Sequence, residues 1–177
     1  MLLIKNGRVV DPVSGVDKVM DVLVDGGRIA AVGDKAAALL DEKDRTAQII
    51  DASGLVVAPG LVDTHVHFRD PGFTYKEDIM TGAAAAARGG FTTVVCMANT
   101  KPPVDNVDTL EYVLKKGAQT GIHVLSAATV SKGLAGKELV DMEVLAEAGA
   151  AGFTDDGIPI MDEHVLVEAM DRAKKLN

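Results

Sequence analysis

Two histidines separated by one residue, His65 and His67, are the side chains of this sequence best suited by type and spacing to bind a metal ion. In a β-strand, residues i and i+2 point to the same side, so both imidazoles can face one ion. The same pair also fits polar residues that finish an exposed strand. Arg69, Asp70 and the turn pair Pro71-Gly72 follow at once and place charge and a sharp turn against the same strand end. This crowding favours the metal-site interpretation.

A carboxylate from a different strand would complete such a site. In parallel α/β sheets and barrels, active sites collect at the carboxyl ends of the strands. Asn99 follows the second apolar strand of the pattern described below, and Asp155 and Asp156 follow the fourth. Two histidines and a carboxylate are suitable ligands for Zn²⁺ or a similar divalent ion, and Asp156 could bridge two ions because a carboxylate has two oxygens. A metal-bound water has its pKa lowered to about 7, which supplies hydroxide at neutral pH.

The remaining reactive side chains are expected to lie outside this site. His123 falls inside an apolar strand and should be packed or support the site indirectly, whereas His164 lies early in a helical stretch and should face solvent. Cys96 comes near the end of a buried strand and is expected in the core. Lys101, beside two prolines, fits either an anion contact in a loop or an ordinary surface charge, and we favour the surface charge.

Residues 1–54 read as short strands separated by Gly and Asp turns. Leu2–Lys5 runs into Asn6-Gly7, a strong hairpin signal, and a later strand ends at Gly26-Gly27. The segment 35–45 is polar or weakly helical. Short strands at this spacing predict a small antiparallel sheet or sandwich. Its acidic residues fall at turns, where Asp is favoured for backbone reasons, so this part is expected to be structural.

From residue 55, apolar strands alternate with helical stretches, which is typical of a parallel α/β arrangement. The expected strands are 55–66, 91–97, 121–128 and 150–154, and the expected helices are 76–88, 107–116, 137–148 and 161–176. Four such units are half of a (β/α)8 TIM-type barrel, or a four-stranded open sheet. A closed barrel needs about 250 residues, so the pattern predicts a truncated first half of a barrel over 55–177. A complete half-barrel that pairs with another chain is the alternative.

Composition and net charge limit the kinds of partner and cellular location that fit this sequence. The 177 residues suggest one domain or a little more, and 47% hydrophobic with 25% charged residues is ordinary for a globular protein. A net charge of -8 argues against nucleic acid or an anionic membrane surface as partner, but not against a small anionic substrate held by a local cation. The single cysteine excludes an internal disulfide. With no stretch apolar enough for a signal peptide or a membrane span, the expected location is the cytoplasm.

Three motifs together resemble the cyclic amidohydrolases, and specifically the dihydroorotases. The most specific is His65-Val66-His67-Phe68-Arg69-Asp70-Pro71-Gly72, and Met97-Ala98-Asn99-Thr100 and Phe153-Thr154-Asp155-Asp156-Gly157 follow in order. Ala98 replaces the proline that is usual in the second motif, a change in a loop rather than a ligand. The third motif is similar to the bacterial class in which an aspartate replaces a carboxylated lysine. The resemblance covers nearly the whole chain and implies an N-terminal β-sandwich domain over 1–54 that precedes the barrel.

The resemblance also implies metal ligands. His65 and His67 match the first two ligands of the family, and Asp156 matches the ligand that bridges two ions, with Asp155 as the alternative. The implied cofactor is Zn²⁺, one or two ions per site.

The implied reaction is the reversible closure of N-carbamoyl-L-aspartate to (S)-dihydroorotate in pyrimidine biosynthesis. Arg69, Asn99 and His67 match the substrate-binding residues, in keeping with the planar fork that arginine presents to a carboxylate. In the hydrolytic direction, a metal-bound hydroxide attacks the ring amide carbonyl that the metal polarises.

The implied active site is incomplete within this chain. The family has two further metal-binding histidines and a general acid/base aspartate on later strands, which are expected beyond Asn177. No catalytic residue is therefore assigned within the segment, and residues 1–177 alone are not expected to turn substrate over. For partners, the resemblance implies a homo-oligomer or a complex with aspartate carbamoyltransferase.

Two alternatives remain open. A hydantoinase or allantoinase would act on another cyclic amide, but those enzymes do not need Arg69 for a substrate carboxylate, and hydantoinases use a lysine near the fourth strand that 149–157 lacks. A non-catalytic homologue that scaffolds a carbamoyltransferase is the second alternative. The intact residues His65, His67 and Asp156 argue against it.

Overall fold

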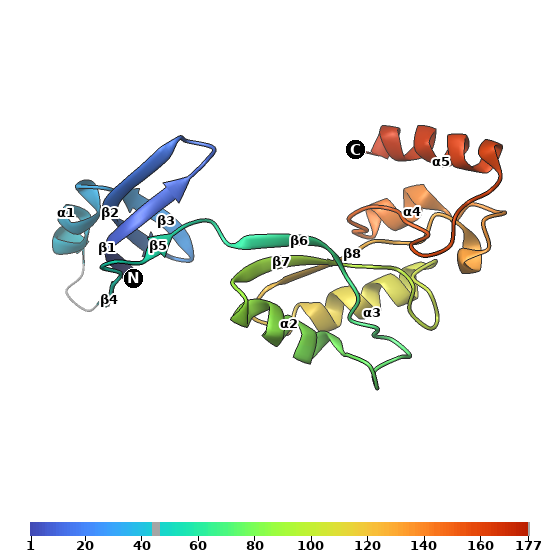
Figure 1. Ribbon diagram of the computed structural model, residues 1–177, viewed down its shortest axis with the longest axis horizontal. Coiled ribbons are helices and arrows are strands. Elements are labelled where there is room, and N and C mark those ends of the chain that lie inside the picture. The colour runs from blue at the N-terminus through green and yellow to red at the C-terminus, as the bar shows by residue number, and fades with distance from the viewer. Residues whose placement is uncertain (44–46, 177) are drawn as a thin grey trace. The chain divides into compact units, whose positions relative to one another are not determined.

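The computed structural model describes residues 1–43 and 47–176. The chain divides into two compact units, Met1–Pro59 and Gly60–Asn177. Figure 1 labels the helices and strands of both. None of the helices in the described ranges has both the length and the apolar character that crossing a bilayer requires.

The first unit is a five-stranded sheet with the order β3-β2-β1-β4, in which β5 also pairs with β1. Its elements are β1 (Leu2–Asp11), β2 (Val16–Asp25), β3 (Arg28–Val32), α1 (Lys35–Lys43), β4 (Gln48–Asp51) and β5 (Val56–Val57). The first three strands pair antiparallel, whereas β4 and β5 run parallel to β1. The expectation of an antiparallel sheet therefore holds for β1 to β3 and is wrong for β4 and β5. The chain crosses over by way of α1 before β4 and so returns in the direction of β1.

The hairpin predicted at Asn6-Gly7 is absent, and β1 continues through both residues. The pairing of β1 with β2 shifts register between Ile4 and Gly7, which is a β-bulge. Asn6 has a left-handed φ of 60°, and its N–H donates to Asp21 Oδ1 at 2.9 Å. The backbone conformation that makes Asn-Gly a turn signal thus produces a bulge here, because β2 remains available as a pairing partner on both sides of it.

Helix α1 packs on this sheet and encloses a small core. Ala36 and Leu40 of the helix are buried together with Leu3 and Leu23 of the strands. The expected weakly helical segment 35–45 is helical as far as Lys43, and its remainder lies outside the described residues.

The second unit is an α/β arrangement, as the alternating pattern predicts. Three parallel strands form a sheet in the order β6-β7-β8. The elements are β6 (Leu61–Val66), α2 (Ile79–Arg88), β7 (Phe91–Cys96), α3 (Val107–Gly117), β8 (His123–Ser126), the short 3-10 turn η1 (Lys132–Leu134), α4 (Met142–Glu147) and α5 (Glu163–Leu176). Asp78 and Asn106 begin α2 and α3 by accepting hydrogen bonds from backbone N–H groups of the first helical turn.

Three expected elements of this unit differ from the structure. The strand expected over 55–66 is broken, because β5 ends at Val57 in the first unit and β6 begins only at Leu61. The strand expected over 150–154 is reduced to one parallel bridge between Ala128 and Phe153. The helix expected over 137–148 begins at Met142, because Leu139 instead forms an antiparallel bridge with Ser131.

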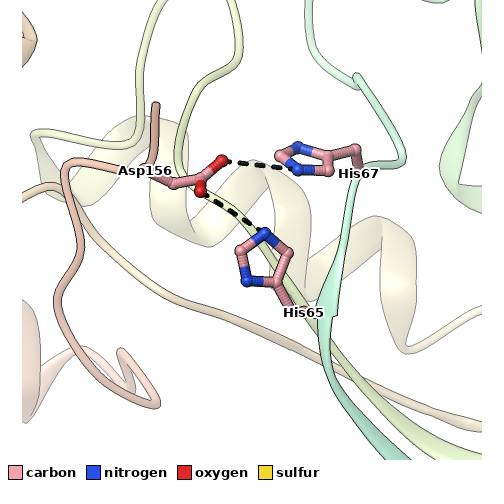
Figure 2. Close-up of side chains that lie close together, drawn as sticks. All are labelled: His65, His67 and Asp156. Carbon is pink, nitrogen blue, oxygen red and sulfur yellow. Dashed lines mark ion pairs between the residues drawn. The ribbon is translucent and has the colours of Figure 1, made fainter. Parts of the chain in front are cut away.

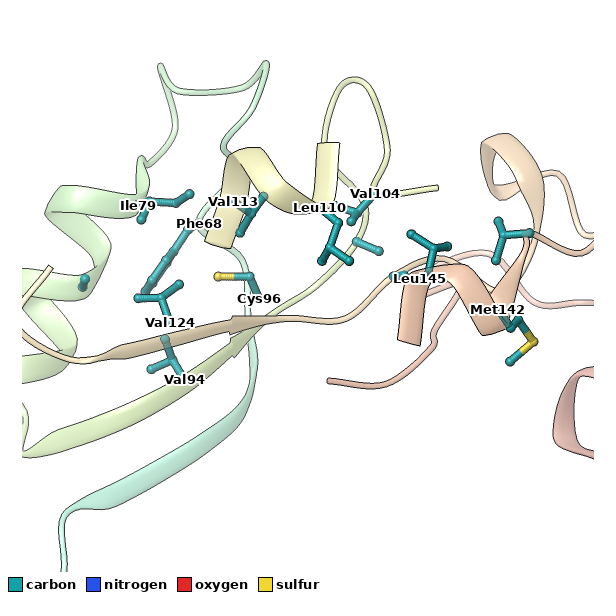
Figure 3. Packing of buried hydrophobic residues seen from close by; sticks show 14 of the residues in the cluster. Phe68, Ile79, Val94, Cys96, Val104, Leu110, Val113, Val124, Met142 and Leu145 are labelled. Carbon is teal, nitrogen blue, oxygen red and sulfur yellow. The ribbon is translucent and has the colours of Figure 1, made fainter. Parts of the chain in front are cut away.

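The main core lies between this sheet and its helices (Figure 3). Alternation along the strands decides which side chains enter it, so Val94, Cys96 and Val124 are buried. They meet Ile79 of α2 and Val113 of α3. The expectation that Cys96 belongs to the core is confirmed: its burial raises the pKa of the thiol to about 12.

Phe68, in the segment after β6, packs against helix α2. A Cβ placed on Gly82 of α2 would lie 2.4 Å from Phe68 Cδ1, so only glycine allows the ring to approach this closely. Phe68 is 7% exposed and follows His67 directly. This contact therefore fixes the backbone beside one of the candidate metal ligands.

We expect Gly82→Ala to lower the free energy of unfolding by about 1–2 kcal/mol. Helix propensity alone would make the change favourable by about 1 kcal/mol, but overpacking costs about 1–3 kcal/mol. Chemical denaturation of residues 1–177 measures the effect, and the Phe68→Leu background serves as the control. There the added methyl group should be neutral or stabilising. A stabilising effect of Gly82→Ala in the wild-type background would contradict the packing argument.

Candidate metal centre

His65, His67 and Asp156 converge on one point (Figure 2). His65 Nε2 lies 3.4 Å from Asp156 Oδ1, and His67 Nε2 lies 3.3 Å from Asp156 Oδ2. One nitrogen or oxygen from each residue lies within 4.8 Å of the others, and in the described part of the chain this is the one such group of three or more His, Cys, Asp or Glu residues. Two ring nitrogens and a carboxylate are a donor set that suits a divalent ion such as Zn²⁺.

The end of β6 supplies both histidines. His65 is the last residue but one of the strand, and His67 follows its final residue, Val66. The two rings face the same carboxylate with their centroids 5.1 Å apart. The His65 side chain is 55% exposed and that of His67 is 29% exposed, so the site is open to solvent on the His65 side.

The two adjacent aspartates have different surroundings. Asp155 is buried and accepts hydrogen bonds from the backbone N–H groups of Val130 and Ser131, at 2.8 and 3.1 Å, and from Ser131 Oγ. Thr154, just before it, donates its N–H to the Ala128 carbonyl at 2.9 Å. These bonds hold the loop, and Asp156 is left to face the histidines. Of the two carboxylates that the sequence left open, the structure brings Asp156 to the histidines.

Asn99 connects the members of the cluster. Its Oδ1 lies 3.0 Å from His67 Nδ1, and its Nδ2 donates to Asp156 Oδ2 at 3.0 Å. An amide oxygen only accepts hydrogen bonds, so His67 Nδ1 carries the proton in this contact. The lone pair of His67 Nε2 then faces the carboxylate side, where a metal ion would be bound. The donor set and its orientation fit a divalent ion.

Arg69 lies beside this network. Its Nη1 is 3.5 Å from Asn99 Oδ1, and its side chain is half-buried. The backbone of Arg69 is left-handed with φ 61°, a conformation that costs a non-glycine residue about 1–3 kcal/mol. Its neighbours Phe68 and Asp70 are both buried, and they hold the chain in this conformation.

The other candidates lie outside the cluster. The expectation that His123 is packed or supports the site is wrong, because Val124 and Ser126 of β8 enter the core and His123 faces the exposed side of the strand. His164 is exposed at the start of α5, and Lys101 is exposed in its loop, as expected for both.

Sequence reasoning missed a second set of contacts next to the site. The buried carboxylate of Asp70 binds Tyr112 and Lys116 of α3. The sequence could have indicated a role for Asp70, since it belongs to the motif that contains both histidines. It gave no indication for Tyr112 and Lys116, because they lie 42 and 46 residues further along in an ordinary amphipathic helix.

Comparisons with known proteins identify the family of the chain. A model of the dihydro-orotase-like family matches residues 54–177. The chain is 59% identical over its whole length to a dihydroorotase of Clostridioides difficile and 56% identical to one of Streptococcus pneumoniae. It spans 41% and 40% of those two proteins, so it covers about two fifths of the curated relatives that it matches.

Solved structures show the same fold. An L-hydantoinase from Arthrobacter aurescens matches 99% of this chain with a TM-score of 0.76 at 26% identity, and the match covers 38% of that enzyme. A crystal structure of a dihydroorotase matches 99% of the chain with a TM-score of 0.57 at 20% identity, over 48% of its own length. Because the family model covers most of the sequence and the curated relatives align with nearly all of it, the chain belongs to the dihydroorotase-like family.

Proposed function

We propose that the whole protein is a metal-dependent dihydroorotase that interconverts N-carbamoyl-L-aspartate and (S)-dihydroorotate in pyrimidine biosynthesis. The observation that carries the proposal is the cluster of His65, His67 and Asp156 with a guanidinium beside it. Relatives that are 51–59% identical and named dihydroorotase support this substrate class.

In this proposal, His65, His67 and Asp156 hold Zn²⁺, one or two ions per site. A bound ion supplies a Lewis acid and a water of lowered pKa. Asn99 keeps His67 in the tautomer that leaves Nε2 free, and it also holds one oxygen of Asp156. This contact fixes two ligands in the absence of substrate, which reduces the reorganisation that metal binding requires.

Arg69, with Asn99 and His67, binds the carboxylate of the substrate. Arg69 offers several N–H donors in a plane, and it shares Asn99 Oδ1 with His67. A guanidinium that contacts Asn99, next to a metal ion, favours a small anionic molecule whose amide lies close to its carboxylate. Dihydroorotate has both groups on one ring.

A hydantoinase is the alternative that the fold similarity favours, since an L-hydantoinase gives a TM-score of 0.76. Its 26% identity is far below the 51–59% of the curated relatives named dihydroorotase. Arg69 and the absence of lysine from 149–157 also favour the dihydroorotase reaction over the hydantoinase reaction. A non-catalytic scaffold for aspartate carbamoyltransferase is disfavoured because the ligand cluster is intact.

The finer fold, location and partners belong to the same proposal. We infer that the sheet β6-β7-β8 is the first part of a (β/α)8 barrel, and that residues 1–54 contribute to a β-sandwich domain. The proposal also includes a cytoplasmic location, a homo-oligomer and a possible complex with aspartate carbamoyltransferase. The net charge of -8 supports the exclusion of nucleic acid.

We expect residues 1–177 to bind Zn²⁺ or Co²⁺, and His65→Ala, His67→Ala and Asp156→Ala each to weaken binding at least about tenfold, because each change removes a ligand atom. Titration calorimetry and the visible absorption of bound Co²⁺ measure the effect.

Two variants serve as controls for metal binding. His123→Ala removes an exposed histidine of the same unit and should leave the affinity unchanged. Asp155→Asn should also retain the metal but lower the free energy of unfolding by about 1–3 kcal/mol, because it weakens the bonds to Val130 and Ser131. Wild-type metal affinity in His65→Ala would refute the assignment of that ligand.

We expect Arg69→Gln in the whole protein to raise KM for dihydroorotate about 10- to 100-fold, since a hydrogen bond to a charged group contributes about 1.5–3 kcal/mol. Metal content should not change. Steady-state kinetics and metal analysis test both statements.

The matched control is Arg88→Gln, which removes an exposed arginine at the end of α2 and should leave KM unchanged. Hydantoin, which has no carboxylate, provides a second control. If Arg69→Gln lowered activity on hydantoin as much as on dihydroorotate, Arg69 would not be the carboxylate-binding residue.

A further inference from the structure

Asp70 is a buried carboxylate that the proposed reaction does not use. Its side chain has 0% exposure, yet it makes three polar contacts. Lys116 Nζ lies 2.5 Å from Oδ2, Tyr112 Oη donates to Oδ1 at 2.9 Å, and the backbone N–H of Ile79 donates to Oδ2 at 3.3 Å. A buried carboxylate persists only with such bonds, because its desolvation is costly.

These contacts join the chain after β6 to two helices. Ile79 is the first residue of α2, whereas Tyr112 and Lys116 lie one turn apart on α3. Lys116 Nζ also lies 3.5 Å from Tyr112 Oη and 5.7 Å from the centre of its ring. The hydrogen bond and the charge of Asp70 raise the pKa of Lys116, so the ammonium stays charged throughout the physiological range.

Arg69 lies between two anchored residues. Phe68 packs against Gly82 on one side, and Asp70 binds α3 on the other. Because left-handed φ is unfavourable for arginine, this conformation persists only where the neighbouring contacts impose it. The contact of Arg69 with Asn99 depends on the same backbone conformation, since a change of φ would redirect the side chain.

We propose that Asp70, Lys116 and Tyr112 form a positioning clasp that holds Arg69 in its left-handed conformation and so sets the affinity for the substrate carboxylate. None of the three touches the cluster of His65, His67 and Asp156 through any contact in the described residues. The clasp therefore acts on substrate binding through Arg69. The expected change in KM rests on the proposed function. The expected order of the Arg69 side chain does not.

The kinetic test uses Lys116→Met in the whole protein with its metal bound. Misplacement of a positioned group by about 1 Å can cost up to about 100-fold in activity. Because Arg69 binds the substrate carboxylate in the proposed function, KM for dihydroorotate should rise about tenfold, while kcat and metal content stay within about twofold. Tyr112→Phe removes one hydrogen bond and should raise KM by about threefold. Lys116→Arg keeps the charge and should restore most of the affinity.

Lys115→Met is the matched control. Lys115 is the neighbouring lysine on α3, and its ammonium pairs with Glu111 at 2.5 Å on the exposed surface. It makes no contact with Asp70 within the described residues, so its loss should leave KM unchanged.

A structural measurement separates this inference from the proposed function. The NMR signal of the Arg69 Nε–Hε group in residues 1–177 should show an ordered side chain in the wild type and in Lys115→Met, and a mobile one in Lys116→Met. If the wild-type whole protein did not hydrolyse dihydroorotate, the proposed function would fail, and this signal alone would decide whether the clasp positions Arg69.

Three results would contradict the proposal that the clasp positions Arg69. One is an unchanged KM and an unchanged Arg69 signal in folded Lys116→Met. Another is a parallel loss of kcat and metal, which would make the contacts a general structural brace. If Lys116→Met does not fold, Tyr112→Phe decides the question, and wild-type KM and Arg69 order in that variant would be the third such result.

Discussion

The contact of the Asp156 carboxylate with His65 and His67 is the interaction on which the rest of the site depends. Asp156 lies about ninety positions after the histidines in the sequence. It meets them because the parallel bridge between Ala128 and Phe153 brings the chain back beside the sheet, near the carboxyl end of β6. Without a cation between them, the lone pair of His67 Nε2 and the Asp156 carboxylate oxygen, 3.3 Å apart, repel each other. The arrangement gains its full stabilisation with a divalent ion.

Two buried carboxylates, Asp155 and Asp70, hold the segments that carry Asp156 and Arg69. Asp155 is bound by Ser131 and fixes the loop from which Asp156 projects, and Asp70 is bound by Lys116 and fixes the segment that carries Arg69. In each case the buried aspartate is the direct sequence neighbour of a candidate site residue: Asp155 precedes Asp156, and Asp70 follows Arg69. Burial with full hydrogen bonding makes each anchor rigid, since any displacement would leave a desolvated charge without its bonds. In the proposed function, Asp156 and Arg69 then remain available for metal and substrate.

Much of the second unit was predictable, and the errors in both units arise where pairing with a distant segment decides the structure. The alternation of apolar strands and helices identified β6, β7 and β8 with their helices, because short β-branched runs and longer amphipathic stretches differ in period and length. At Asn6-Gly7 the sequence indicates a left-handed residue, which the structure contains, but a turn and a bulge need the same φ. At 150–154 the segment is apolar enough for a strand, yet it makes only one bridge with Ala128. Pairing depends on the neighbouring chain, which local sequence does not encode.

The sequence by itself determined the types and order of the candidate site residues: the His-x-His pair, Arg69, Asn99 and an aspartate pair, each at the end of an expected strand. Only the tertiary structure decided that Asp156 rather than Asp155 faces the histidines, that Asn99 links His67 to Asp156, and that Lys116 binds Asp70. The reason is physical. Residue type and period follow from local chemistry, whereas the direction of a side chain after a strand end depends on which distant groups satisfy its charge and hydrogen bonds.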